Sequence, residues 1–333
     1  AVAFVATLGM LASLLSWGFS LVFGGLLVRA LARRPELRMD YRAAGAAAYL
    51  GLGAVWALGL SSSAAQLQAN PASMPPELLA ITGVLPFAQT IGLWQSLLLA
   101  AVLIVVSVAV AYWSAPDAGA ARPAPDSAGL DVERAAPGER ASARPGDWLE
   151  VSPLLTVLLS LLAFGWLATE FSSKPAVVAI ASLNTYNFLF LSLGLLLHWR
   201  PRSFLDAVAG AVPATTGVLL QFPLYGAIAA LLTSVPGADG LSLAQRLAQA
   251  FVAAAPGGAF APVVGAYSAV LGFFVPSGGG KWLIEAPYVM QAAVEVRAHL
   301  GWAVQAYNAG EALPNLVNPF WMLPLLGVLG LKA

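Results

Sequence analysis

The sequence LGFFVPSGGGKW occupies residues 271–282, inside a long apolar region at 259–294. A helix running through it would be costly, because glycine disfavours helix by about 1 kcal/mol and proline by about 3 kcal/mol relative to alanine. Lys281 adds about 2.5–3.5 kcal/mol if it lies at a bilayer centre, so it should have a partner: Glu285, Glu311 or an anionic substrate. Broken backbone in a membrane must be buried in protein or line a wet cavity. We interpret the break as the tip of a re-entrant hairpin that presents backbone N–H groups to an anion. The alternative is an ordinary surface loop.

The composition around this stretch indicates a polytopic α-helical membrane protein. Of the 333 residues, 59% are hydrophobic and 10% charged, and the mean hydropathy is +0.79, whereas soluble domains carry about 25% charged residues. Several runs reach the roughly 20 apolar residues that a spanning helix needs. The chain lacks cysteine, which excludes disulfides and thiolate metal sites. Its zero net charge argues against a nucleic-acid partner.

Changes in composition divide the chain into three parts. Residues 114–150 are rich in Ala, Pro, Gly and charged residues and are expected to form a disordered linker. We expect a first repeat at 1–113 and a second at 151–333. Spans are predicted at 43–69, 87–113, 153–170, 175–198 (with Asn184) and 207–233, the last interrupted at Pro223 after Gln221. Three connectors carry most of the arginines: residues 29–42, the linker, and the segment with residues 200 and 202. The excess of positive charge places these three connectors on the cytoplasmic side.

A second interruption lies in the last apolar segment, at 300–331. Asn308, Glu311, Asn315 and Asn318 would share one face of a helix, and Pro314 would break that helix beside Glu311. Polar stripes in membrane helices usually face a cavity or another helix, and hydrogen bonding between packed spans is the alternative interpretation. Glu311 is the candidate for binding a coupling proton or sodium ion.

The order of features at the C-terminal end also occurs near the N-terminus. A run with a break at Trp17–Ser20 precedes a connector and a second break at Gly59–Ser63, at an offset of about 256–258 residues from the C-terminal features. Paired interruptions in two halves are typical of transporters built from inverted repeats. The expected fold class is therefore an all-α polytopic membrane protein with inverted repeats, each containing a re-entrant hairpin and a broken transmembrane helix.

Other chemistries find little support in the sequence. The Gly-Lys pair at 280–281 is not a P-loop, because Val275 stands where a glycine is needed and Trp282 where Ser or Thr is needed. We find no catalytic constellation, metal-ligand pattern or cofactor motif, so an enzyme is not expected. Asn184 and Gln221 are interpreted as supporting polar residues of a site or as packing polarity.

Several motifs resemble the short-chain fatty acid transporter family. They are Ser16-Trp17-Gly18-Phe19, Gln221-Phe222-Pro223 with Tyr225, residues 275–282, and Asn318-Pro319-Phe320-Trp321 with Leu323-Pro324. The resemblance covers nearly the whole chain except the linker. It implies a carrier for acetoacetate, butyrate or similar monocarboxylates in a superfamily of two-hairpin elevator carriers, located in the bacterial inner membrane. Because this superfamily tends to dimerise, the resemblance also implies a homodimer. Family members have further spans at both ends, so we expect this chain to be a fragment.

The predicted function is therefore secondary transport of a small monocarboxylate captured between two hairpin tips. Two rivals remain: a dicarboxylate carrier of the same superfamily, which should carry a second fixed cation, and a non-transporting scaffold or receptor, in which the breaks should lie at the surface. The predicted substrate-binding residues are Ser16, Trp17, Gly18, Ser20, Ser61, Ser62, Ser277, Gly278, Gly279, Gly280, Lys281, Asn308 and Asn315.

Overall fold

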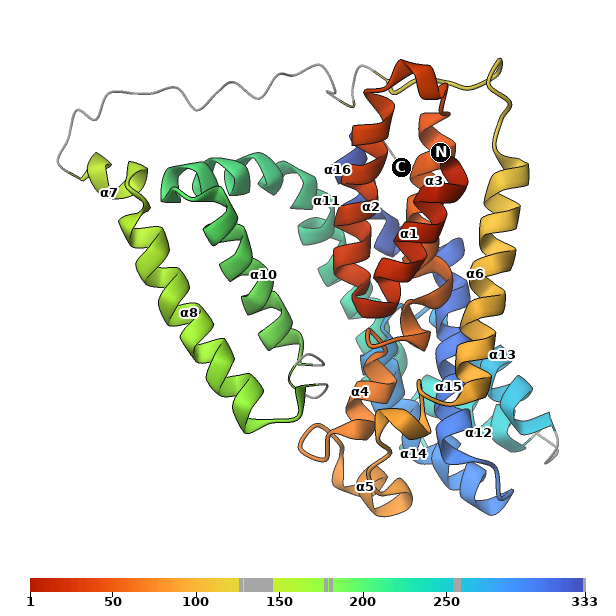
Figure 1. Cartoon of the computed structure of the whole chain (residues 1–333). Helices are drawn as coiled ribbons and strands as arrows, with labels where there is room; N and C mark the ends of the chain where they lie inside the picture. Colours follow the sequence, from red (N-terminus) through yellow and green to blue (C-terminus); the bar gives the residue numbers. More distant parts are fainter. Residues whose placement is uncertain (126–127, 129–145, 177–178, 180–181, 254–258, 332–333) are drawn as a thin grey trace. The chain divides into compact units, whose positions relative to one another are not determined.

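Helices make up the architecture, and serines, glycines and prolines mark their ends. The structure is a computed structural model (Figure 1) that describes residues 1–125, 128, 146–176, 179, 182–253 and 259–331. The described residues contain helices and no strand, which confirms the all-α prediction. The helices up to the linker are α1 Val2–Leu15, α2 Trp17–Ala32, α3 Tyr41–Leu50, α4 Ser63–Ala69, α5 Pro76–Thr82 and α6 Trp94–Ser114. Those after it are α7 Asp147–Val151, α8 Pro153–Ser173, α10 Leu183–His198, α11 Pro201–Ser234, α12 Leu243–Ala253, α13 Phe260–Gly272, α14 Gly278–Glu295, α15 Leu300–Ala312 and α16 Met322–Leu329.

The chain divides into two units. Unit 1 comprises residues 1–128 and 217–333, and unit 2 comprises 129–216. Within unit 2, α8 packs against α10 and α7 against α8. The repeat boundaries predicted above and the inverted relation between the repeats stay predictions.

Among the described residues, three helical stretches are long and apolar enough to cross a membrane: Tyr41–Ala69, Trp94–Ser114 and Pro153–Ser173. A fourth candidate is the pair Leu300–Leu316 and Pro319–Leu329, bent by 75°. The span predicted at 87–113 begins later than expected, at Trp94, because a short 3₁₀ turn at Phe87–Gln89 and a further turn precede it.

Two further predicted spans also differ from the structure. The span predicted at 175–198 corresponds to α10, which begins at Leu183; residues 177–178 and 180–181 of that prediction lie outside the described residues. Helix α11 continues through Pro223 instead of stopping there. A helix can accommodate an internal proline in a membrane when its neighbours satisfy the freed backbone group, so the predicted interruption at Pro223 was wrong.

The first hairpin consists of α1 and α2, which lie side by side and antiparallel (Figure 1) and pack on α3. They contain 14 and 16 residues, fewer than the roughly 20 that cross a bilayer. The turn between them is the single residue Ser16, which is extended with φ −153°. These lengths fit a hairpin that enters and returns, which remains a prediction.

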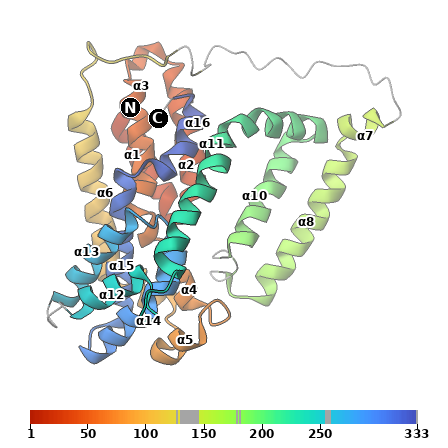
Figure 2. The ribbon, with the colours of Figure 1, turned by 180° about the vertical axis from the view of Figure 1, so that it is seen from behind.

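The second hairpin is more open than the first. A connector at 273–277 joins α13 to α14; α13 packs mainly on α15, while α14 packs on α12, α5 and α15. Figure 2 shows α12 to α15 gathered at one end of unit 1, beside α4 and α5. Helices α4, α5, α13, α14 and α15 share an apolar core that includes Trp282, Met290 and Tyr307, all fully buried.

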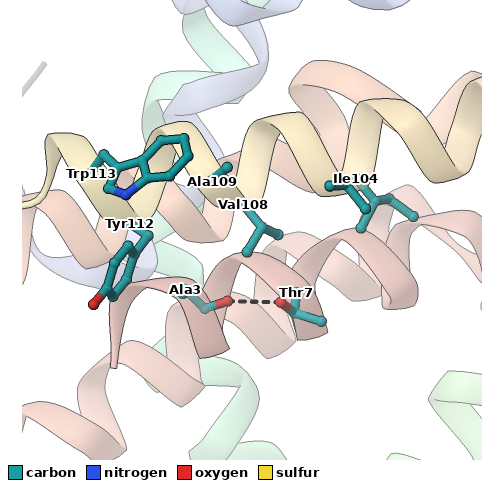
Figure 3. Close-up of a pocket in the computed structure, with 8 residues that line it drawn as sticks. Ala3, Thr7, Ile104, Val108, Ala109, Tyr112 and Trp113 are labelled. Atoms are coloured by element: carbon teal, nitrogen blue, oxygen red, sulfur yellow. Dashed lines mark hydrogen bonds between the residues drawn. The ribbon is translucent and has the colours of Figure 1, made fainter.

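A groove of about 480 Å³ runs between α1 and α6 (Figure 3). Its lining is apolar except for Thr7 and Tyr112, and the Thr7 hydroxyl donates to the Ala3 carbonyl at 2.9 Å within its own helix. Large apolar side chains of α6, such as Val105 and Trp113, are 67% and 79% exposed. This surface therefore offers hydrocarbon contact, as a lipid-facing surface does, and carries no charged group.

The first residues of the predicted linker are bonded to α2 and α3. The Arg122 N–H donates to the Asp40 carboxylate at 2.9 Å, and the Tyr41 N–H donates to the Arg122 carbonyl at 3.0 Å. The Arg29 guanidinium donates to the Ala128 carbonyl at 2.7 Å. Most of the remaining linker, residues 126–127 and 129–145, lies outside the described residues.

Candidate functional site

The first hairpin tip is hydrogen-bonded to the first broken helix. Ser16 caps α2, because its hydroxyl accepts from the Phe19 N–H at 3.3 Å. The N–H of Trp17, the first residue of α2, donates to the Ser61 hydroxyl at 2.8 Å. The Ser61 hydroxyl in turn donates to the Ser13 carbonyl at 2.9 Å. A serine from the break thus bridges both arms of the hairpin at its tip.

The first break is longer than the sequence predicted. A π-helical turn at Gly51–Val55 and a 3₁₀ turn at Trp56–Leu58 follow α3 before the bend expected at Gly59–Ser63. Gly59 lies against the Leu14 backbone, where a Cβ would clash, so a glycine is needed for this close approach. After the bend Ser62 caps α4, accepting from the Ala65 N–H at 3.2 Å.

The second hairpin tip repeats the cap of the first. Ser277 is extended, and its hydroxyl accepts from the Gly280 N–H at 3.3 Å at the start of α14. Two carbonyls of this tip are held by the second broken helix. The Tyr307 hydroxyl donates to the Gly278 carbonyl at 2.8 Å, and the Trp321 indole N–H donates to the Pro276 carbonyl at 3.1 Å.

The spacing predicted that the polar residues of the second break share one helical face. The structure does not bear this out. Helix α15 ends at Ala312, and a 3₁₀ segment, Leu313–Leu316, follows. Asn308 donates to the Gln305 side chain at 2.6 Å, and Asn315 to the Glu311 carbonyl at 3.4 Å. Pro314 has no N–H with which to continue the α-helix, so Asn315 and Asn318 lie beyond α15 rather than on its face. The break beside Glu311 itself was predicted correctly.

Asn318 fastens the second break to the second hairpin. Its amide donates to the Phe273 carbonyl at 3.2 Å, and its side-chain oxygen accepts from the Phe320 N–H at 2.9 Å. It therefore caps the short 3₁₀ turn Pro319–Trp321 that leads into α16.

Each hairpin tip also contacts the broken helix of the other half of the chain. The rings of Trp17 and Trp321 meet edge to face with centroids 5.1 Å apart. Gly278 lies against Trp56, and Gly279 lies against the Ser63 side chain, so that an added Cβ would be 2.7 Å and 3.2 Å from them. Both tips and both breaks therefore meet in one region of unit 1.

A buried group of charges lies next to the second tip. Lys281 and Glu311 form an ion pair, and both side chains are almost fully buried. The Lys281 ammonium also donates to the Ser268 carbonyl at 2.8 Å and to the Ser268 hydroxyl at 3.1 Å, and it lies 4.9 Å from the centre of the Tyr307 ring. Of the three partners that the sequence allowed for Lys281, the structure gives Glu311.

The remaining predicted residues have different surroundings. The Ser20 hydroxyl is buried and donates to the Gly9 carbonyl at 2.8 Å inside the first hairpin. Gly18, by contrast, faces open space. Asn184 lies exposed on α10 in unit 2. Gln221 lies in α11, but its side chain is outside what the structure describes.

Sequence reasoning missed Trp56, Ser268 and Tyr307 as members of this region. Tyr307 and Trp56 read as ordinary apolar positions in the sequence. Ser268 is a small polar residue within apolar α13, and its only signal was that a buried lysine needs acceptors.

Comparison with known proteins identifies the family. A model of the family described as "Short chain fatty acid transporter" matches residues 1–333. This chain belongs to the short-chain fatty acid transporter family. A protein of Escherichia coli (strain K12) is 34% identical over 98% of this chain and 71% of its own length. One from Haemophilus influenzae is 29% identical over 99% of this chain and 72% of its own length. Both carry the name "Putative short-chain fatty acid transporter".

No solved structure matches the chain significantly. The family membership identifies a membrane transporter rather than an enzyme, in agreement with the apolar helices.

Proposed function

We propose that this member of the short-chain fatty acid transporter family carries acetoacetate, butyrate and similar small monocarboxylates across the bacterial inner membrane. The observation that carries the proposal is the meeting of both hairpin tips with both breaks, through Trp17 and Trp321 on one side and Gly278 and Trp56 on the other. Helix breaks at membrane depth are tolerated at a buried or wet site, and paired breaks in two halves are typical of a carrier's substrate site.

The anion would be held by helix N-termini. Helices α2 and α14, of 16 and 18 residues, both begin at a tip with an extended serine cap. A helix N-terminus presents free N–H groups and partial positive charge, which suit a carboxylate. The serines of the first break and the amides of Asn308 and Asn315 would complete the site, while the short acyl chain contacts the aromatic rings.

A monocarboxylate is favoured over a dicarboxylate by the state of Lys281. A second carboxylate would need a second cationic group, and the lysine that the sequence offered is already paired with Glu311. A scaffold or receptor is disfavoured because its helix breaks should lie at the surface. In this structure Ser61, Ser62 and Asn315, which belong to the two breaks, are all at least 94% buried.

The rest of the proposal concerns movement and setting. Each hairpin is bonded to a broken helix, as in the Trp17–Ser61 and Pro276–Trp321 contacts, so a tip and a break could move as one body past a fixed frame in an elevator-type cycle. Coupling to H⁺ or Na⁺ would use the buried charges around Glu311. The multi-pass orientation, with the 114–150 linker cytoplasmic, and a homodimer are part of the same proposal.

The test is uptake by proteoliposomes that contain the full-length protein. Labelled butyrate and acetoacetate should enter saturably, and excess unlabelled propionate should compete while succinate should not. Sodium and proton gradients are imposed separately to find the driving ion. Uptake equal to that of protein-free liposomes would refute transport of this class, and competition by succinate alone would favour the dicarboxylate carrier.

A further inference from the structure

Glu285 is a buried carboxylate in the same cluster as Lys281 and Glu311. It lies on α14 one turn after Lys281 and is 1% exposed. Its electrostatic neighbours are Lys281, Glu311 and the hydroxyl of Tyr267 on α13. The described part of this cluster therefore holds two carboxylates and one cation.

The single cation is fully committed to other acceptors. A lysine ammonium has three N–H donors. The donors of Lys281 are matched by the Ser268 carbonyl, the Ser268 hydroxyl and the Glu311 carboxylate. Both oxygens of Glu285 are buried. The hydroxyl of Tyr267 is a hydrogen-bonding neighbour of this carboxylate, but it carries no charge that could neutralise an ionised Glu285.

The other charged groups on elements packed against α14 lie at the surface. Glu77 of α5 is exposed, as is Glu295 at the end of α14. Arg246 of α12 is about half exposed and paired with Asp239. The titratable groups that face Glu285 from the interior are thus Tyr267 on α13, Lys281 on its own helix, and Tyr307 and Glu311 on α15.

An ionised carboxylate that has no cation of its own is very costly to bury, and such a group takes up a proton instead. We propose that Glu285 is the proton-binding site of the carrier, and that it binds a proton when α14 is packed as in this structure and releases it when α14 meets water. This inference rests on the proposed transport function. A proton fits better than Na⁺, because the ammonium of Lys281 lies in the same cluster and would repel a second cation, whereas a proton neutralises the carboxylate.

The location links the proton to the substrate. Glu285 lies eight residues after Ser277, the cap of the same helix, which is about 12 Å at 1.5 Å per residue. A movement that opens the tip of α14 would therefore also change the burial of Glu285, and Glu311 would act by holding Lys281 in place.

The experiment compares the wild-type protein with E285Q and with the matched control E295Q, which removes an exposed carboxylate of the same helix. Proteoliposomes are tested for butyrate counterflow at equal pH and for accumulation driven by an imposed proton gradient. Glutamine mimics the protonated acid, so E285Q should retain counterflow, lose proton-driven accumulation and show no pH dependence. E295Q should behave as wild type.

The outcomes separate this inference from the function on which it rests. If the wild-type protein moves no butyrate, the proposed function fails. If the wild-type protein moves butyrate and E285Q still accumulates it in response to a proton gradient, the inference fails. The inference also fails if E285Q loses accumulation driven by a sodium gradient and keeps accumulation driven by a proton gradient. Should E285Q not fold, E285D keeps a titratable group and is expected to retain proton coupling with a shifted pH profile. An unchanged pH profile in E285D would overturn the inference.

Discussion

The ammonium group of Lys281 is paired with the carboxylate of Glu311, and neither side chain reaches solvent. The pair joins α14 to α15 and so connects the second hairpin to the second broken helix. Breaking a buried pair by removing one partner typically costs about 3–5 kcal/mol, because the other charge stays buried and uncompensated.

We predict that Lys281→Met and Glu311→Gln each destabilise the protein by about 3–5 kcal/mol, and that the double variant recovers much of this loss. Unfolding in detergent measures the cycle. The matched control is Lys174→Met, which removes the pair between Lys174, about half exposed just after α8, and Glu170 and should cost less than about 1 kcal/mol. Additive losses in the double variant would show that the two charges do not compensate each other.

A side chain at Gly278 should disturb the meeting of the second tip with the first break. A Cβ there would lie 2.7 Å from the Trp56 ring, and such overpacking costs about 1–3 kcal/mol. Gly278→Ala should therefore lower butyrate uptake about tenfold, which corresponds to about 1.4 kcal/mol. Gly165→Ala on α8, where nothing lies within 4 Å, should leave uptake unchanged. Full activity of Gly278→Ala would contradict the tight contact.

Ser61 should hold the first tip in place. Ser61→Ala removes the acceptor of the Trp17 N–H and the donor to the Ser13 carbonyl, and a buried group left without its partner costs about 1–3 kcal/mol. Amide hydrogen exchange at residues 16–20 should speed up about tenfold or more. Ser173→Ala, which removes an exposed hydroxyl on α8, serves as the control. Unchanged exchange at Trp17 in Ser61→Ala would mean that other contacts hold the tip.

Asp40 should tie the start of the linker to α3 in a pH-dependent way. Burial acts to raise the pKa of Asp40, but N–H groups of Ala43, Arg122 and Arg42 outweigh it and hold that pKa below its usual value. A lowered folded-state pKa adds stability above the unfolded pKa of about 3.9, and this stability is lost as pH falls through the folded value.

Asp40→Ala should therefore be less stable than wild type by about 1 kcal/mol at pH 7, and the gap should close as the pH falls below about 4. The backbone N–H of Arg122 donates a hydrogen bond to the Asp40 carboxylate, so hydrogen exchange at this amide should also speed up in Asp40→Ala. Glu36→Ala, at an exposed carboxylate nearby, is the control. A gap that persists at low pH would rule out the Asp40 carboxylate as its source.

Sequence reasoning located the interruptions because they depend on local chemistry. Pro276 lies in the non-helical connector at 273–277. The three glycines after Ser277 disfavour helix, yet they form the first turn of α14, which begins at Gly278, so the break ends before them. Gly59 and the serines after it likewise marked the first bend, although the π-helical turn at Gly51–Val55 extended the break. A turn of that kind has no distinct sequence signal.

The contacts between these interruptions could not be predicted, because they depend on how distant segments pack. Nothing local in Trp17 indicates that it meets Trp321, or in Gly278 that it lies against Trp56. Sequence reasoning extended one helical face past Pro314, where the real chain turns into a 3₁₀ segment. It also gave three partners for Lys281, and only packing selects Glu311.

The most direct test of the account is whether substrate occupies the tip of α14. The chain lacks cysteine, so Ser277→Cys at the exposed cap and Ser173→Cys at an exposed control position can be labelled separately with a maleimide in proteoliposomes. We predict that butyrate and acetoacetate slow the labelling of position 277 and leave that of 173 unchanged. If position 277 is labelled at the same rate under saturating butyrate while the variant still transports it, the substrate binds elsewhere and the central claim is wrong.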